Sequence, residues 1–221
     1  MTTKSLIIEL QSFWHTGTGK SSGSHLDALT DKDRNGLPFL PGRHIKGLLR
    51  DAYRHTRALG WIDDPKDPDG EHPLEKLLFG SQSGKELRTE TIPGMLRVSN
   101  AELSLAEKSA LNADETLKPH LFFEMFSTAI DAAGVAKTET LRGIEVCAPM
   151  QLRSHLVLDL TAVESRHLKE QKEFRERDNC WQWLEQALPL LDAVGANRNR
   201  GLGEALFALK DEPKQQQREK S

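Results

Sequence analysis

Residues 42–60, GRHIKGLLRDAYRHTRALG, carry the clearest structural pattern in the chain and constrain its fold most. At 100° per residue, the apolar side chains fall on one side of a helix and the basic side chains on the other. The pattern predicts an amphipathic helix over about 43–59 that ends at Gly60. The apolar side holds Ile45, Leu48, Leu49, Ala52 and Leu59, and the basic side holds Arg43, Lys46, Arg50, Arg54 and Arg57.

The basic side of this helix has two interpretations, a solvated face or a surface that binds an anion. Residues 42–57 hold five Lys or Arg against one Asp, a net charge of +4, and only Asp51 is available for local pairing. Five cations in one stripe repel one another unless something anionic covers them. Residues 63–75 hold six acids against Lys66, and we expect 63–73 to form a solvated loop.

The rest of the chain alternates predicted strands, loops and helices. The order β–α–β–β–α–β predicts an α+β fold, with a ferredoxin-like (RRM-like) core and a long N-terminal loop insertion. We expect strands over 4–13, 94–103, 151–162 and after residue 203, helices over 74–79 and 178–193, a long loop over 14–41, and an extended hairpin within 120–150 that turns around Gly134.

Composition limits the class of protein. The chain has 221 residues, 37% of them apolar and 29% charged, which is typical of a soluble globular domain. Its net charge of −3 argues against a histone-like binder of nucleic acid. Cys147 and Cys180 are too few for a four-cysteine zinc site or a disulfide scaffold. No apolar run approaches the roughly 18 residues of a membrane span. We therefore expect a cytoplasmic protein with reduced cysteines.

The stretch WHTGTGKSS (14–22) follows a predicted strand and looks like a phosphate-binding loop. Such a loop needs Gly at the position of Trp14 and a helix directly after Lys20. Gly23, Gly36 and Pro38 prevent a helix of useful length there, so the sequence disfavours an NTPase.

Two other loops offer candidate site residues. In GANRNRGLG (195–203), glycines let backbone N–H groups approach an anion, and Arg198 and Arg200 add charge; an ordinary loop before a strand remains the alternative. In the long loop, His25 lies near Asp27, Asp31 and Asp33, and an aspartate at such a position is more often a turn former than a catalyst.

Four segments together resemble the RAMP superfamily of CRISPR-associated proteins. LPFLPGRHIKGLLRDAYR (37–54) resembles its "LPYIPGSSLKGALR" segment, and LLFGS (77–81) with GMLRVSNA (94–101) resembles its "FG" and "RLRVSDA" stretch. TAIDAAGVAKTETLRGIEVCAPMQL (128–152) resembles its thumb hairpin, and GANRNRGLGEALF its C-terminal glycine-rich loop. Departures are GRHIKG for "GSSLKG" and the loss of one Gly and a Ser from the final loop. The hairpin and the basic helix are similar to those of the backbone subunit of type III effector complexes.

This resemblance implies a single RAMP domain over 1–210, with the thumb at about 120–150, followed by a disordered polar tail over 211–221. It implies guide RNA (crRNA), target RNA and other effector subunits, including further copies of this chain, as partners. The thumb, with Phe122, Phe123, Met125 and Phe126 at its base and Ile130 nearer its tip, would wedge into the guide–target duplex. The residues implied to bind RNA are His15, Arg43, Lys46, Arg50, Arg54, Lys137, Arg142, Gly195, Arg198, Arg200, Gly201 and Gly203.

The resemblance also implies chemistry. Asp27 falls where catalytic backbone subunits carry their cleaving aspartate, with Asp31 as the fallback. Asp27 would bind a divalent metal, Mg²⁺ or Mn²⁺, or help to activate a 2′-hydroxyl, and the expected product is a 2′,3′-cyclic phosphate. Three alternatives stay open: a structural guide-binding subunit without activity, a metal-independent guide-processing ribonuclease that uses His15 and His44, and an interaction domain that binds no nucleic acid.

Overall fold

The computed structural model describes residues 2–17, 19, 26–64, 73–81, 93–159 and 177–212. It is a mixed α/β protein with two antiparallel sheets. The four-stranded sheet has the order β2-β5-β1-β6, so the first strand in sequence lies at the centre beside the last. Its strands are β1 (Thr2–Leu10), β2 (Leu96–Val98), β5 (Gln151–Leu158) and β6 (Ala205–Asp211).

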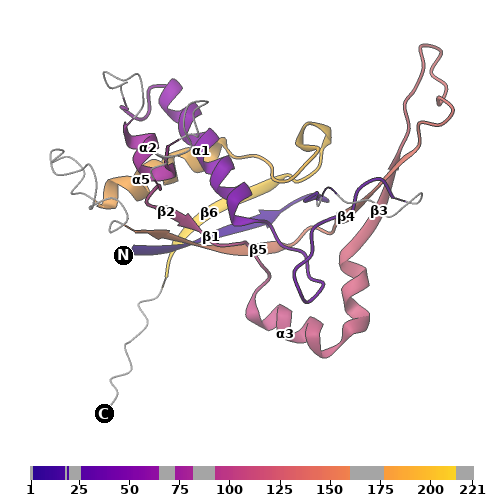
Figure 1. Cartoon of the computed structure of the whole chain (residues 1–221), viewed down its shortest axis with the longest axis horizontal. Helices are drawn as coiled ribbons and strands as arrows, with labels where there is room; N and C mark the ends of the chain where they lie inside the picture. Colours follow the sequence, from indigo (N-terminus) through magenta and orange to yellow (C-terminus); the bar gives the residue numbers. More distant parts are fainter. Residues whose placement is uncertain are drawn as a thin grey trace.

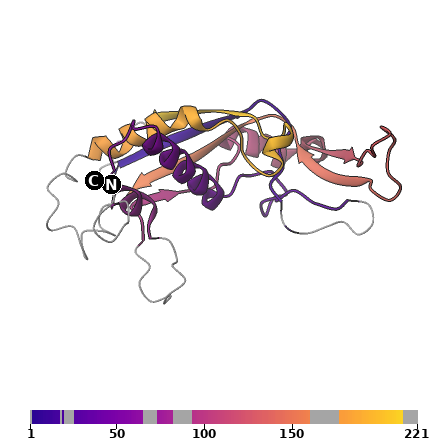
Figure 2. The same cartoon turned by 90° about the horizontal axis from the view of Figure 1, so that it is seen from above.

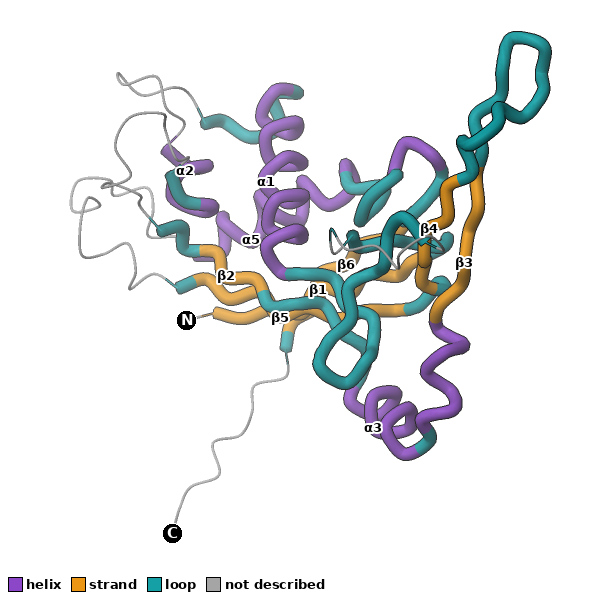
Figure 3. The backbone as a smooth tube through the Cα atoms, turned by 45° about the vertical axis from the view of Figure 1, so that its right-hand side comes forward, coloured by secondary structure: helices purple, strands orange, loops and turns teal. Residues whose placement is uncertain are grey.

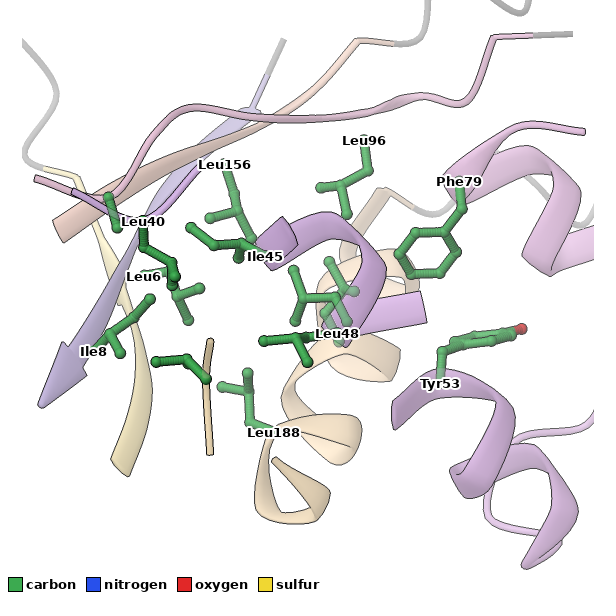
Figure 4. Close-up of a cluster of buried hydrophobic side chains, with 14 of the residues drawn as sticks. Leu6, Ile8, Leu40, Ile45, Leu48, Tyr53, Phe79, Leu96, Leu156 and Leu188 are labelled. Atoms are coloured by element: carbon green, nitrogen blue, oxygen red, sulfur yellow. The ribbon is translucent and has the colours of Figure 1, made fainter. Parts of the chain in front are cut away.

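Helices α1 (Gly42–Ala58), α2 (Pro73–Phe79) and α5 (Arg177–Ala187) lie on the same side of this sheet (Figure 1). The core forms between them, where Leu6 and Ile8 of β1 meet Ile45 and Leu48 of α1 (Figure 4). The predicted apolar side of α1 is therefore confirmed up to Ala52, but Leu59 lies beyond the helix and is 58% exposed. Burial alternates along β5, as the predicted half-exposed strand requires.

The start of α1 is fixed by close backbone contact with the end of β2. Gly42 is buried there, and a side chain at this position would overlap the backbone of Val98 and Ser99. The N–H of Gly42 donates to Oδ1 of Asn100 at 2.9 Å, which satisfies one of the unpaired donors of the first turn.

The predicted hairpin is confirmed. Strands β3 (Phe122–Ser127) and β4 (Arg142–Cys147) pair with each other and project away from the main sheet (Figures 1 and 2). Residues 128–141 continue the projection as an exposed tip, drawn as loop in Figure 3. Asp131 closes this tip, because its Oδ1 accepts from the N–H groups of Ala133 and Val135, both at 2.9 Å. Gly134, at φ +79°, provides the turn.

Several expected boundaries differ. The long loop pairs with other segments at Ala28–Ile144 and Leu40–Ala101 and with itself at Lys32–Pro38, so much of it is fixed. The helix expected over 178–193 ends at Ala187, because Pro189 turns the chain into a short 3₁₀ segment. Strand β6 includes Asp211, where the polar tail was expected to begin; residues 213–221 of that tail lie outside the described residues.

One helical region was missed. Helix α3 (Leu105–Ala113) and the 3₁₀ helix η1 (Glu115–Leu121) precede the hairpin, and α3 lies on the side of the sheet away from α1 (Figure 1). The sequence contains a signal for it in the capping box of Ser104 and Glu107, each of which binds the backbone N–H of the other. No described helix is long and apolar enough to cross a membrane.

Candidate nucleic-acid interface

Strand β4 holds the loop that carries Asp27. The backbone N–H of Asp27 donates to the carbonyl of Gly143 at 2.8 Å, and the N–H of Gly143 donates to Asp27 Oδ2 at 2.9 Å. Two residues further along, the N–H of Glu145 donates to the carbonyl of Ala28. These bonds fasten Asp27 to the base of the hairpin, where its side chain is exposed.

In the described part of the chain, Asp27 has no neighbouring side chains that would complete the ligand set of the predicted metal. No group of three His, Cys, Asp or Glu residues is close enough there to hold an ion. Asp33 is a turn former, since its Oδ1 accepts from Asn35 and Leu37, and Asp31 is held through its backbone to Thr16. His25 lies outside the described residues. Asp27 alone therefore does not make a protein metal site.

His15 connects the hairpin to the glycine-rich loop. Its side chain is buried, and Nδ1 donates to the carbonyl of Glu145 at 2.7 Å. Its own carbonyl accepts from the N–H of Ala196 at 2.8 Å. His15 is therefore a buried residue that joins strand β4 to the glycine-rich loop.

The glycine-rich loop keeps an unusual backbone path. Gly195 and Gly203 have φ of +80° and +77°, and a side chain at either would overlap the carbonyl of His15 or Val194 respectively. Between them, residues 198–200 form a short 3₁₀ turn, and residues 195–200 line a hollow of about 400 Å³. In Figures 1 and 2 this loop lies between α1 and the β3–β4 hairpin.

Much of the basic stripe on α1 is paired inside the protein. Nε of Arg50 and Nη2 of Arg54 lie 2.7 Å from Oε1 of Glu75, and Nη1 of Arg57 lies 2.9 Å from Oε2. Lys46 donates to the carbonyl of Leu96 at 2.7 Å. Asp51 is the local partner of the stripe, as expected, but α2 also brings a distant and buried carboxylate, that of Glu75, against it.

Glu75 is ionised in this setting. Burial acts to raise the pKa of its carboxyl, but hydrogen bonds from Arg54, Arg50 and Arg57 outweigh burial and lower that pKa to about 2. Asp64, expected in a solvated loop, is also buried. Its carboxylate accepts from the N–H groups of Leu74 and Glu75, at the start of α2. Residues 65–72 lie outside the described part of the chain.

The predicted RNA-binding cations thus divide into two sets. Lys46, Arg50 and Arg54 are at least half-buried and bonded to other protein groups. The second set is exposed, and none of its members forms an ion pair with a described residue. That set is Arg43 at the start of α1, Lys137 and Arg142 on the hairpin, and Arg198 and Arg200 on the glycine-rich loop.

Aromatic and aliphatic side chains line the same hairpin. Phe123, Phe126 and Ile130 are 45%, 48% and 66% exposed, and the Phe123 ring lies 5.2 Å from that of Phe13. Phe122 and Met125 are half-buried. Exposed apolar groups beside cations that have no ion pair with a described residue fit a polyanion that also offers flat, apolar surfaces, as a nucleic acid does.

Glu75 and Glu145 were not predicted from the sequence, although their carboxylates hold other residues of this site in place. The carboxylate of Glu145 accepts from the N–H of Thr30 at 3.1 Å and from Nζ of Lys32 at 2.8 Å. Each contact joins residues more than one hundred positions apart. No local pattern in the sequence encodes such a contact.

Comparisons with known proteins agree with this architecture. A chain of the Type III-B Cmr-beta complex bound to cognate target RNA superposes with a TM-score of 0.57 at 11% identity, over 95% of this chain and 97% of that one. A chain of the same complex in its apo state gives 0.59 at 11% identity, over 94% and 97%. No curated protein matches the sequence. The sequence profile of the RAMP superfamily matches residues 7–205, which is most of the chain, and the protein therefore belongs to that superfamily.

Proposed function

We propose that this chain is a backbone subunit of a type III CRISPR ribonucleoprotein that binds guide RNA and cleaves complementary target RNA at regularly spaced sites. The observation that carries the proposal is the pair Arg198 and Arg200, exposed and unpaired within the described residues, on a glycine-rich loop beside a projecting hairpin. Family membership and the likeness to chains of an RNA-binding complex support it.

In this proposal the loop and the free cations hold the phosphates of the guide. Arg198 and Arg200 would neutralise phosphates, and Arg43, at the start of the neighbouring helix, would extend the same track. Phosphate contacts position a strand without reading its sequence. That property suits a subunit that must hold any guide.

The hairpin would act on the guide–target duplex. Its exposed Phe123, Phe126 and Ile130 could enter between base pairs, at a cost of a few kcal/mol for each unstacked step. Lys137 and Arg142 on the same hairpin would contact the backbone of the displaced strand. Asp27 is fastened to the base of this hairpin, so a nucleotide displaced there would lie next to it.

For cleavage, we assign Asp27 the role of general base. No described residue donates to its Oδ1, while Oδ2 is held by Gly143. The 2′-hydroxyl of the displaced nucleotide would give its proton to Oδ1, and the 2′-oxygen would attack the adjacent phosphorus. The bond to the 5′-oxygen of the next nucleotide then breaks, and that oxygen takes a proton from water. The products are a 2′,3′-cyclic phosphate and a 5′-hydroxyl.

The ferredoxin-like description of the core is part of the same proposal. Setting the hairpin sheet aside, the order β2-β5-β1-β6 places the first strand between the third and fourth strands of the main sheet. All three strand pairs are antiparallel, and α1, α2 and α5 lie on one face. This arrangement supports a β–α–β–β–α–β unit into which the hairpin and α3 are inserted.

The test is cleavage of target RNA by the complex co-purified with its guide. Wild type is compared with Asp27→Asn, whose amide oxygen can still accept from Gly143, and with Asp31→Asn as the matched control. Each is assayed with Mg²⁺, with Mn²⁺ and with EDTA. We expect regularly spaced products from wild type and Asp31→Asn, and none from Asp27→Asn. EDTA decides whether a divalent ion takes part.

Other outcomes would identify the alternatives. A complex that holds guide and target without cutting would make this chain a structural subunit. Cleavage of the guide precursor that is insensitive to EDTA and depends on His44 would indicate a processing ribonuclease. Failure of the purified complex to retain guide RNA would overturn the proposal.

A further inference from the structure

His44, in the first turn of α1, is hydrogen-bonded to the glycine-rich loop. The backbone N–H of Gly195 donates to Nε2 of His44 at 3.0 Å. Because a backbone N–H can only donate, Nε2 must be unprotonated, and the neutral ring carries its proton on Nδ1. The bond joins residues 151 positions apart, and it lies where the loop begins.

The loop has few other attachments among the described residues. At its start, the N–H of Ala196 donates to the carbonyl of His15, and at its end the N–H of Gly203 donates to the carbonyl of Phe13. Between these points, Arg200 and Gly201 donate only to Asn197 and Arg198 within the turn itself. Among the described residues, the His44 bond ties the loop to α1.

We propose that His44 is a positioning residue for RNA binding, whose unprotonated Nε2 holds Gly195 and so orients the turn that carries Arg198 and Arg200. This inference rests on the proposed function of the loop.

Burial and the local electrostatics favour the neutral form of the His44 ring. Burial lowers the pKa of His44 below its usual range, and the charge of Arg198 lowers it further. Arg198 is the cation that faces it from the loop. On its own helix Arg43 is exposed, and Lys46 is bonded to Leu96. His15 presents its carbonyl to the loop, while its ring is bonded to Glu145. Protonation of His44 would remove the acceptor and place a second cation beside Arg198.

The first part of the test needs no RNA and uses the full-length, ¹⁵N-labelled chain. Ring ¹⁵N spectra report whether Nε2 of His44 is unprotonated, and amide exchange reports the protection of Gly195. His44→Gln keeps an acceptor at the position of Nε2, whereas His44→Ala removes it. His55→Ala, an exposed histidine on the same helix, is the matched control. We expect protection of Gly195 to fall roughly fivefold in His44→Ala, the effect of one hydrogen bond, and to stay near wild type in the other two.

Acidification gives a second readout that loss of packing would not produce. After correction for the intrinsic exchange rate, protection of the Gly195 amide in wild type should fall as the His44 ring takes up a proton. We expect this at a pH below about 6.5, which is the usual pKa of a histidine side chain. His44→Gln should show no such step. A protonated Nε2 at neutral pH, or equal protection in wild type and His44→Ala, would overturn the inference.

The second part measures guide RNA affinity of the assembled complex. His44→Ala should weaken it roughly fivefold, with the melting temperature of the chain little changed, and His44→Gln should restore most of it. Affinity that is equally low in both variants would contradict a role based on the acceptor. If the wild-type complex holds no guide, the proposed function fails, and the amide measurements alone decide whether His44 holds the loop.

Discussion

The strongest stability prediction concerns Glu75, the carboxylate shared by three arginines. Its side chain is 8% exposed, and the three guanidinium groups lie within 2.9 Å of it. They lower its pKa from 4.5 to about 2 against the opposing effect of burial. A shift of that size corresponds to about 3 kcal/mol of folding free energy at neutral pH, at 1.36 kcal/mol per unit. Glu75→Gln should therefore destabilise the protein by about 3 kcal/mol, in the range for breaking a buried ion pair.

The pH dependence has a definite sign. A carboxyl whose folded pKa is lowered contributes its full stability above its unfolded pKa, here 4.5. That contribution is lost as the pH falls from about 4.5 to about 2. The free energies of unfolding of wild type and Glu75→Gln should thus differ most at neutral pH and converge in acid. Urea unfolding, followed by circular dichroism over this range, measures both curves.

A matched control separates burial from mere charge. Asp51 also contacts Arg54, at 3.6 Å, but its side chain is 63% exposed. Exposed ion pairs contribute less than about 1 kcal/mol, so Asp51→Asn should have a small effect. The reasoning is refuted if Glu75→Gln lies within about 0.5 kcal/mol of wild type at neutral pH, or if the difference between the curves persists unchanged in acid.

Three further predictions concern the loop and the cysteines. Replacing Arg198 and Arg200 together by Ala should leave the melting temperature unchanged. It should reduce the slope of log affinity for guide RNA against log salt concentration by about 1.4, or about 0.7 for each lost phosphate contact. Filter binding across a salt series measures this slope, and an unchanged slope would contradict the contacts. Gly203→Ala should lower the free energy of unfolding, measured by urea denaturation, by about 2 kcal/mol, because φ is +77° and the new side chain would meet the carbonyl of Val194. A variant as stable as wild type would argue against this backbone path. Burial raises the pKa of Cys147 to about 12 and that of Cys180 to about 11. Neither thiol should therefore react with iodoacetamide at about pH 8 until urea unfolds the chain. Rapid labelling of the folded protein would show that the thiols are not buried.

Patterns that are local in the chain were sufficient for most elements of this fold. The period of α1, the alternation in β5 and the turn around Gly134 each depend on residues close in sequence, so hydrophobic spacing and turn chemistry predict them. The capping box of α3 was present in the same way and was overlooked. The glycine-rich loop and its two arginines were also predicted, since glycine at special backbone positions is visible in sequence.

The division of the cations could not be predicted in this way. Arg50 and Arg198 are equally basic in the sequence, yet one is bonded to Glu75 and the other is exposed without an ion pair among the described residues. The difference depends on where α2 folds relative to α1. Asp64 lies in a segment whose charge pattern indicated a solvated loop, and Glu75 lies in the predicted helix that follows it, yet both carboxylates are buried.

The sequence by itself determined the order of the main-sheet strands and their helices, the amphipathic helix and the family segments, because each depends on neighbours a few residues apart. Only the tertiary structure decided which charged groups are neutralised within the protein and which remain available to a ligand. It also joined His44 to Gly195 and Asp27 to Gly143. The physical reason is that ion pairs and hydrogen bonds depend on distances of a few ångströms between atoms. Those distances are set by packing of the whole chain and not by separation along it.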